Sequence, residues 1–223
     1  MNVRIQWNYR SLVGKKRTLF TSDPVSAQDA LIFAADIEKT GRAVQPPEFV
    51  ADNGDIWTRK ELEKLLKKVE TEPHDIIAYF DGGYDRARRM AGLGVVIYFE
   101  QDGSKYRIRK NEAVPSIDSN NEAEYAALWL LLRELELLGA HHTSVIIRGD
   151  SQVVFNQLTG DWPVYEEEEN RWLDRIEAKL SELDLTPKYE PLPRTENKEA
   201  DMLAGQALAG ECIQSRKRLD IHE

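Results

Sequence analysis

Little cysteine, no long apolar run and no basic excess limit what this sequence can encode. Cys212 is the only cysteine in 223 residues, so no disulfide can form within the chain. No stretch approaches the roughly 18 consecutive apolar residues of a membrane-spanning helix. The first residues also contain no apolar signal core. These absences favour a protein of the reducing cytoplasm with no membrane partner.

The charge balance argues against a simple nucleic-acid-binding domain. The net charge is −9, whereas such domains are usually basic. Acids and bases balance in residues 1–75, so the excess of acid lies in residues 76–223. The run Glu166–Glu169 accounts for part of it and is typical of a solvated helix face.

Residues 1–72 predict a small α/β domain. Alternating apolar residues and a turn at Gly14 indicate a hairpin. Ser22 and Pro24 are typical of a helix start, and Thr58 with Glu61 forms a capping box at the start of a second helix. The expected elements are strands at 3–10 and 15–20 and helices at 22–41 and 58–69.

The pattern changes after residue 75, to three β-like runs and then alternating helices and strands. The expected strands are 76–83, 92–100, 105–114, 144–150 and 185–192, and the expected helices are 122–138, 151–159, 164–183 and 198–210. This order implies a mixed sheet with helices packed on it. We therefore expect a second domain at residues 75–212 and a C-terminal tail at 213–223.

Four carboxylates end β-like runs or lie near the starts of helices: Asp81, Glu124, Asp150 and Asp201. Carboxylates that converge repel one another unless a cation lies between them. Hard divalent cations such as Mg²⁺ prefer oxygen ligands. Such a cluster indicates phosphoryl-transfer chemistry on a nucleic-acid backbone, assisted by metal ions.

Each carboxylate, taken alone, also fits a structural role. Asp81 precedes two glycines and suits a turn. Asp150 suits a helix N-cap, and Asp201 suits the positive end of a helix dipole. A surface position suits Glu124, and Glu122 competes with it for the same role.

Taken together, these residues closely resemble the type 1 ribonuclease H family, in its compact bacterial and archaeal branch, over residues 75–211. The motifs that match are Asp81-Gly82, Ser119-Asn120-Asn121-Glu122-Ala123-Glu124, Asp150-Ser151-Gln152 and Asn197-Lys198-Glu199-Ala200-Asp201-Met202-Leu203-Ala204. The resemblance selects Glu124 over Glu122. It implies a ribonuclease H-like five-stranded mixed sheet flanked by helices, preceded by the small N-terminal domain.

The resemblance also implies an activity, which is hydrolysis of the RNA strand of RNA–DNA hybrids. Two Mg²⁺ ions, or Mn²⁺ in their place, would be held by the four carboxylates. Asn121 and Gln152 would contact the nucleic acid beside the cleaved bond. The remaining expected substrate contacts are Gly82, Ser151, Arg194 and Asn197. A monomer is the default expectation for the oligomeric state.

Two departures from the family pattern keep an alternative open. Many members carry a histidine in the loop before the last motif, but residues 189–196 have none. Residues 162–172 are acidic where some members carry a basic segment. The alternative is a catalytically weak or inactive module that binds nucleic acid or protein. A junction resolvase or transposase is a further alternative, disfavoured by the helix start at Asn120 and by Asp150-Ser151-Gln152.

The first 22 residues contain five basic side chains and no acid: Arg4, Arg10, Lys15, Lys16 and Arg17. Trp7, Tyr9 and Phe20 are interleaved with them. Basic residues with exposed aromatics suit contact with a nucleic-acid backbone and stacking on bases. The alternative is that the aromatics fill a small core and the basic side chains are solvated.

Overall fold

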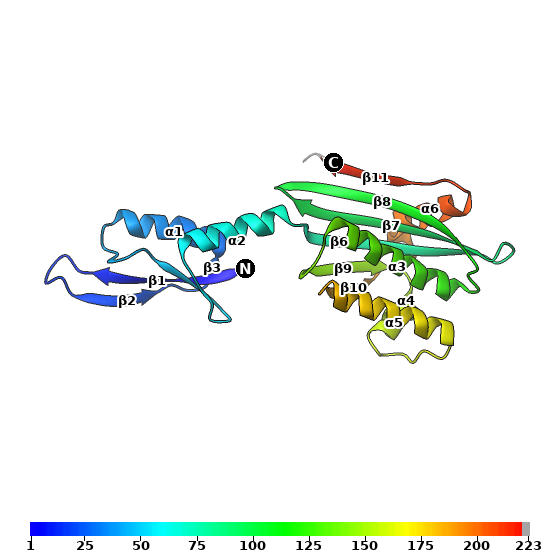
Figure 1. Cartoon of the computed structure of the whole chain (residues 1–223), viewed down its shortest axis with the longest axis horizontal. Helices are drawn as coiled ribbons and strands as arrows, with labels where there is room; N and C mark the ends of the chain where they lie inside the picture. The colour runs from blue at the N-terminus through cyan, green and yellow to red at the C-terminus, as the bar shows by residue number, and fades with distance from the viewer. Residues whose placement is uncertain (220–223) are drawn as a thin grey trace. The chain divides into compact units, whose positions relative to one another are not determined.

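A computed structural model describes residues 1–219, which fall into two compact units. The first unit is Met1–Thr71 and the second begins at Glu72 (Figure 1). Among the described residues, no helix has both the length and the apolar character needed to cross a membrane. The cytoplasmic location stays a prediction.

The N-terminal unit is a sheet packed against two helices. Its elements are β1 (Asn2–Arg10), β2 (Arg17–Thr21), β3 (Val25–Ser26), α1 (Ala27–Lys39), β4 (Glu48–Ala51), β5 (Ile56–Trp57) and α2 (Arg59–Thr71). The strand order is β2-β1-β4-β5, and β3 pairs with β1. Val3, Ile5 and Phe49 from the sheet meet Ala30 and Leu62 from the helices in a core of their own.

The first helix begins later than the sequence predicted. Ser26, not Ser22, is the N-cap of α1 and accepts a hydrogen bond from the Asp29 N–H. The Ser22 hydroxyl is engaged elsewhere, since it accepts from the Ile5 N–H at 2.9 Å. The second helix start is confirmed, because Thr58 and Glu61 exchange backbone–side-chain hydrogen bonds as a capping box does.

The second unit is a mixed α/β structure, which confirms the expected ribonuclease H-like fold class. Its strands are β6 (His74–Asp85), β7 (Met90–Gln101), β8 (Ser104–Pro115), β9 (Ser144–Gly149), β10 (Thr186–Pro191) and β11 (Gln214–Leu219). Its helices are α3 (Asn120–Leu138), α4 (Gln152–Leu158), α5 (Glu167–Glu182), the 3₁₀ turn η1 (Arg194–Glu196) and α6 (Lys198–Leu208). The strand order is β10-β9-β6-β7-β8-β11.

The sheet has a sixth strand where a C-terminal tail was expected. Residues 214–219 pair antiparallel with β8 as β11, along the outer side of that strand (Figure 1). This segment is almost wholly polar, so it shows no apolar alternation that would predict a strand. Backbone pairing holds it, and the Arg216 guanidinium lies over the rings of Phe99 and Tyr106.

Glycines in the central strands let two helices approach the sheet closely from opposite faces. A Cβ at Gly82 would lie 2.3 Å from the backbone of Ala123 in α3. A Cβ at Gly94 would lie 2.2 Å from the carbonyl oxygen of Ala200 in α6. Asp81 pairs with Gly94, so its side chain shares the α6 face, whereas Gly82 faces α3. Both helices can therefore bring side chains to the middle of β6.

Candidate active site

Asp81 and Asp150 come from neighbouring parallel strands. β6 pairs with β9 with Tyr79 opposite Arg148. Asp81 and Asp150 each lie two residues further along, Asp81 within β6 and Asp150 just after β9, so their side chains lie close together. Asp81 is only 5% exposed, so its charge is largely shielded from water.

Glu124 is brought to these two carboxylates by the first turns of α3. The Ser119 hydroxyl caps the helix by accepting from the Glu122 N–H at 3.0 Å. One turn on, the buried Glu124 carboxylate accepts from the Gly82 N–H at 3.2 Å. The close approach of helix and strand thus fixes Glu124 beside Asp81.

Asp201 completes the group from the first turns of α6. All four carboxylates line one cavity of about 430 Å³. The Arg194 guanidinium also lines it and donates to Asp201 at 2.6 Å. Arg194 is mostly exposed, so its ion pair with Asp201 lies open to solvent and is weakly held.

Asn197 links three elements behind the carboxylates. Its side-chain amide N–H groups donate to the Phe80 carbonyl at 2.9 Å, to Asp150 at 3.2 Å and to Asp81 at 3.4 Å. Asn197 is 1% exposed, so it faces the carboxylates and not solvent. It therefore ties the middle of β6 and the residue after β9 to the start of α6.

Burial and mutual repulsion make two of the carboxyls weak acids. Burial, followed by the charges of Asp150 and Asp201, raises the pKa of Asp81 to about 7. Burial, followed by the charges of Asp81 and Asp150, raises the pKa of Glu124 to about 9. The site therefore holds protons near neutral pH and favours their replacement by a cation.

Of the other residues predicted to contact substrate, only some line the cavity. Gly82 lines it directly. Asn121 points elsewhere and donates to Glu169, and Ser151 caps α4 by accepting from the Val154 N–H. Gln152 is exposed in the first turn of α4.

Sequence reasoning did not assign several residues that line the cavity: Gly83, Tyr84, Asn120, Ala204, Gly205 and Leu208. Asn120 could have been found, because it neighbours Asn121 in the matching motif. The others carry little chemical signal on their own, since their role is to shape the walls.

The donor set suits a hard divalent cation. Asp81, Glu124 and Asp150 can each offer an oxygen atom, all within 4.8 Å of one another. A second group with the same spacing is formed by His74, Asp75 and Glu100. It is more exposed and does not line the cavity that holds the four carboxylates. The buried carboxylate group is therefore the better candidate metal centre.

Comparisons of the sequence with known proteins show which proteins this chain is similar to. Residues 79–207 match the family described as "Reverse transcriptase-like". "Uncharacterized protein YpeP" of Bacillus subtilis is 45% identical over 203 residues, which cover 91% of this chain and 89% of that protein. "Ribonuclease HI" of Halobacterium salinarum is 32% identical over 131 residues, covering 59% of this chain and 63% of that protein.

Solved structures show the same likeness in three dimensions. RNase H1 from the halophilic archaeon Halobacterium salinarum superposes with a TM-score of 0.53 at 32% identity, covering 60% of this chain and 98% of that one. LC11-RNase H1, solved in complex with an RNA/DNA hybrid, gives a TM-score of 0.52 at 29% identity, covering 61% of this chain and 98% of that one.

Proposed function

Because this chain belongs to the ribonuclease H family, we propose that it is a metal-dependent endonuclease that hydrolyses the RNA strand of RNA–DNA hybrids. The family supports a nuclease-type enzyme in general. The observation that carries the finer proposal is the convergence of Asp81, Glu124, Asp150 and Asp201 on one cavity. A pure binding module has little reason to hold four carboxylates together. The RNA/DNA hybrid in the LC11-RNase H1 structure supports the choice of substrate.

We propose that Asp81, Glu124, Asp150 and Asp201 hold two Mg²⁺ ions, for which Mn²⁺ can substitute. When bound, such ions activate water and stabilise the leaving oxygen. The protein orients the ligands: the Gly82 N–H fixes Glu124, and Asn197 fixes Asp81 and Asp150. In this proposal these hydrogen bonds set ligand positions before the metal arrives, which lowers the cost of assembling the site.

Arg194 is proposed to contact the substrate phosphate. Its guanidinium already lies in the cavity, where Asp201 holds it. An Arg guanidinium binds phosphate well in a bidentate geometry, so a substrate phosphate in the cavity would suit it. Asn120 at the start of α3 is a second proposed contact, because it lines the same cavity. Gly82, Asn121, Ser151 and Gln152 stay proposed contacts on the strength of the family resemblance.

The proposal is tested by incubating a hybrid labelled on each strand with the full-length protein and Mg²⁺ or Mn²⁺. We expect cleavage of the RNA strand alone, none with EDTA, and none of an all-DNA duplex. The Asp150→Asn variant should bind the hybrid but lose most cleavage, because one metal ligand is weakened. Binding without cleavage by the wild-type protein under both metals would favour the inactive-module alternative. Cleavage of a DNA junction but not of the hybrid would favour a resolvase.

We also propose that the N-terminal unit contributes to hybrid binding through its β1–β2 hairpin. Lys15 and Lys16 lie at the exposed turn and have no ion-pair partner in residues 1–219. In β2, which follows the turn, Phe20 is 45% exposed and stacks on Trp7 at 5.4 Å. Trp7 itself packs against the small core, so the aromatics serve both the core and the surface.

Replacing both Lys15 and Lys16 by Gln should weaken hybrid binding and lower its salt dependence. Each lost phosphate contact reduces the slope of log affinity against log salt by about one. Fluorescence anisotropy at several salt concentrations measures both quantities. The matched control replaces the exposed Lys60 and Lys64 of α2 by Gln. Equal slopes in the two double variants would contradict a specific role for the hairpin.

A further inference from the structure

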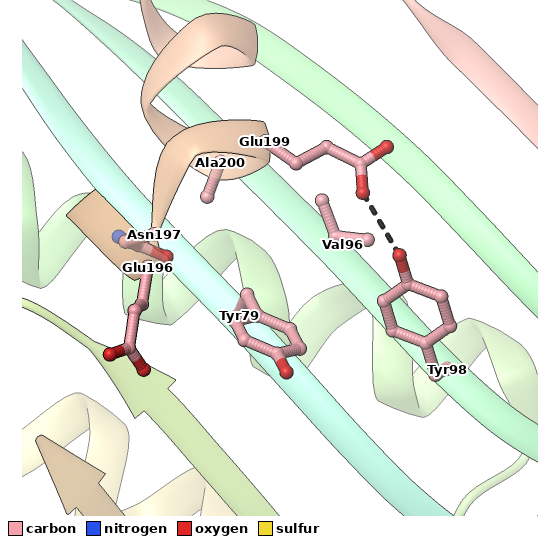
Figure 2. A pocket seen from close by; sticks show the side chains of 7 residues that line it. All are labelled: Tyr79, Val96, Tyr98, Glu196, Asn197, Glu199 and Ala200. Atoms are coloured by element: carbon pink, nitrogen blue, oxygen red, sulfur yellow. Dashed lines mark hydrogen bonds between the residues drawn. The ribbon is translucent and has the colours of Figure 1, made fainter. Parts of the chain in front are cut away.

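A second pocket lies behind the carboxylates, on the α6 face of the sheet. It holds about 200 Å³ and is lined by Tyr79, Val96 and Tyr98 of the sheet and by residues around the start of α6 (Figure 2). Figure 2 shows the Asn197 amide with its oxygen on the side of Tyr79 and Val96 and its nitrogen turned away. The amide oxygen of Asn197 thus lies on the side of this pocket, whereas its amide nitrogen donates to the carboxylates.

The amide oxygen of Asn197 is buried and has no hydrogen-bond partner in the described residues. The residue is 1% exposed. Its orientation is fixed, because the amide nitrogen donates to the Phe80 carbonyl and to two carboxylates. A flipped amide would turn its oxygen toward those acceptors, which is unfavourable. A buried acceptor that lines a pocket in this way suits a ligand with an N–H donor.

The charges around the pocket indicate a cationic ligand. The Glu199 carboxylate is already satisfied by the Tyr98 hydroxyl at 3.0 Å and by Arg107 and Arg109 at 3.2 and 3.1 Å. By contrast, the Glu196 side chain is exposed, and its carboxylate has no hydrogen-bond or ion-pair partner within residues 1–219. One free carboxylate and one buried acceptor therefore line the pocket, and neither is matched by a donor of the protein.

The remaining walls suit a small apolar or flat body. Val96 and the Tyr79 and Tyr98 rings form one side, with the ring centroids 6.0 Å apart in an edge-to-face arrangement. Faces of aromatic rings attract cations. The Arg148 guanidinium already lies over the Tyr79 ring at 5.6 Å, and Glu190 neutralises it. This position over the Tyr79 ring is therefore already occupied, and the pocket's volume limits a ligand to a few heavy atoms.

We propose that this pocket binds a small free organic cation of the alkylguanidinium or alkylammonium type. The cation donates an N–H to the Asn197 amide oxygen and pairs with Glu196, while its carbon atoms pack on Val96 and the tyrosine rings. A donor on the oxygen polarises the amide and strengthens the hydrogen bonds that its nitrogen donates to Asp81 and Asp150. Binding in the pocket is thus coupled to the position of the carboxylates.

The test is an NMR titration of metal-free, full-length protein with methylguanidinium, followed at the side-chain amide of Asn197. Methylurea is the neutral isostere. We expect a saturable shift with methylguanidinium, with a Kd of about 1–10 mM, and binding of methylurea at least tenfold weaker. Glu196→Gln should weaken methylguanidinium binding at least about threefold. The control Asp174→Asn, which removes an exposed charge on α5, should not.

Three outcomes would overturn the proposal. The first is a shift that does not saturate, and the second is equal binding of methylurea. The third is equal affinity in wild-type protein and the Glu196→Gln variant. The experiment measures binding in the absence of metal and hybrid. Its result therefore does not depend on whether the proposed nuclease activity is correct.

Discussion

Replacing Asp81 by Asn is expected to abolish hybrid cleavage and, at the same time, to stabilise the metal-free protein. The loss of cleavage follows from removing a charged ligand from the centre of the proposed metal site. Metal ions contribute several kcal/mol to the stabilisation of such transition states, so a loss of about 10³-fold or more is expected. Single-turnover cleavage with saturating protein measures it without interference from hybrid affinity.

The gain in stability follows from the pKa of Asp81. A carboxyl whose pKa rises to about 7 on folding holds its proton more tightly in the folded state than in the unfolded state. Its contribution to stability is present below about pH 4 and is lost as the pH rises to about 7. At pH 8 the ionised, buried Asp81 therefore destabilises the metal-free fold, by about 2–4 kcal/mol. Asn removes this cost and keeps the shape of the side chain.

The measurement is the free energy of opening of the β6 and α3 amides by hydrogen exchange, in EDTA, from pH 5 to pH 8. This readout reports on the second unit alone, whereas the unfolding of a two-unit chain is not a single transition. The advantage of Asp81→Asn over wild type should grow with pH. Added Mg²⁺ should close the gap by stabilising the wild type. Asp174→Asn, an exposed acid on α5, should show no such pH dependence, and a flat difference for Asp81→Asn would contradict the raised pKa.

The extent to which sequence predicted this structure depended on the strength of each local signal. Strands such as β6 and β7 are central and apolar, so their position was clear. The capping box at Thr58 and the Gly139 C-cap of α3, at a φ of 81°, are local chemistry that a single sequence contains. β11 was missed because its stability comes from pairing with β8 and not from its own residues.

The candidate site also combines features that the sequence could predict with features that only the folded structure shows. The carboxylates could be selected because their motifs occur in the order that the family requires, although each alone fits a structural role. The sequence could not show that Asn197 is buried between Asp81 and Asp150, because this depends on where α6 starts relative to β6 and β9. Nor could it show that Asn121 turns toward Glu169, since that contact joins α3 to α5.

Replacing Gly82 by Ala is expected to destabilise the second unit by about 3 kcal/mol, at the upper end of overpacking costs. Its Cβ would lie 2.3 Å from both the carbonyl carbon and oxygen of Ala123 and 2.5 Å from the Glu124 nitrogen. These are backbone atoms of a capped helix, so no side chain can rotate to relieve the overlap. α3 must move away from β6 as a body, and Glu124 must move with it.

Gly205→Ala is the matched control, because it makes the same chemical change in an exposed position of α6. An added Cβ there has no heavy atom within 4 Å, and Ala is favoured over Gly inside a helix by about 0.5–1 kcal/mol. Gly205→Ala should therefore be neutral or stabilising, whereas Gly82→Ala should open the β6 and α3 amides to hydrogen exchange. Gly82→Ala should also lower metal affinity, because the hydrogen bond from the Gly82 N–H to Glu124 is lost. If both variants proved equally stable, the close approach of α3 to β6 that fixes Glu124 would be wrong.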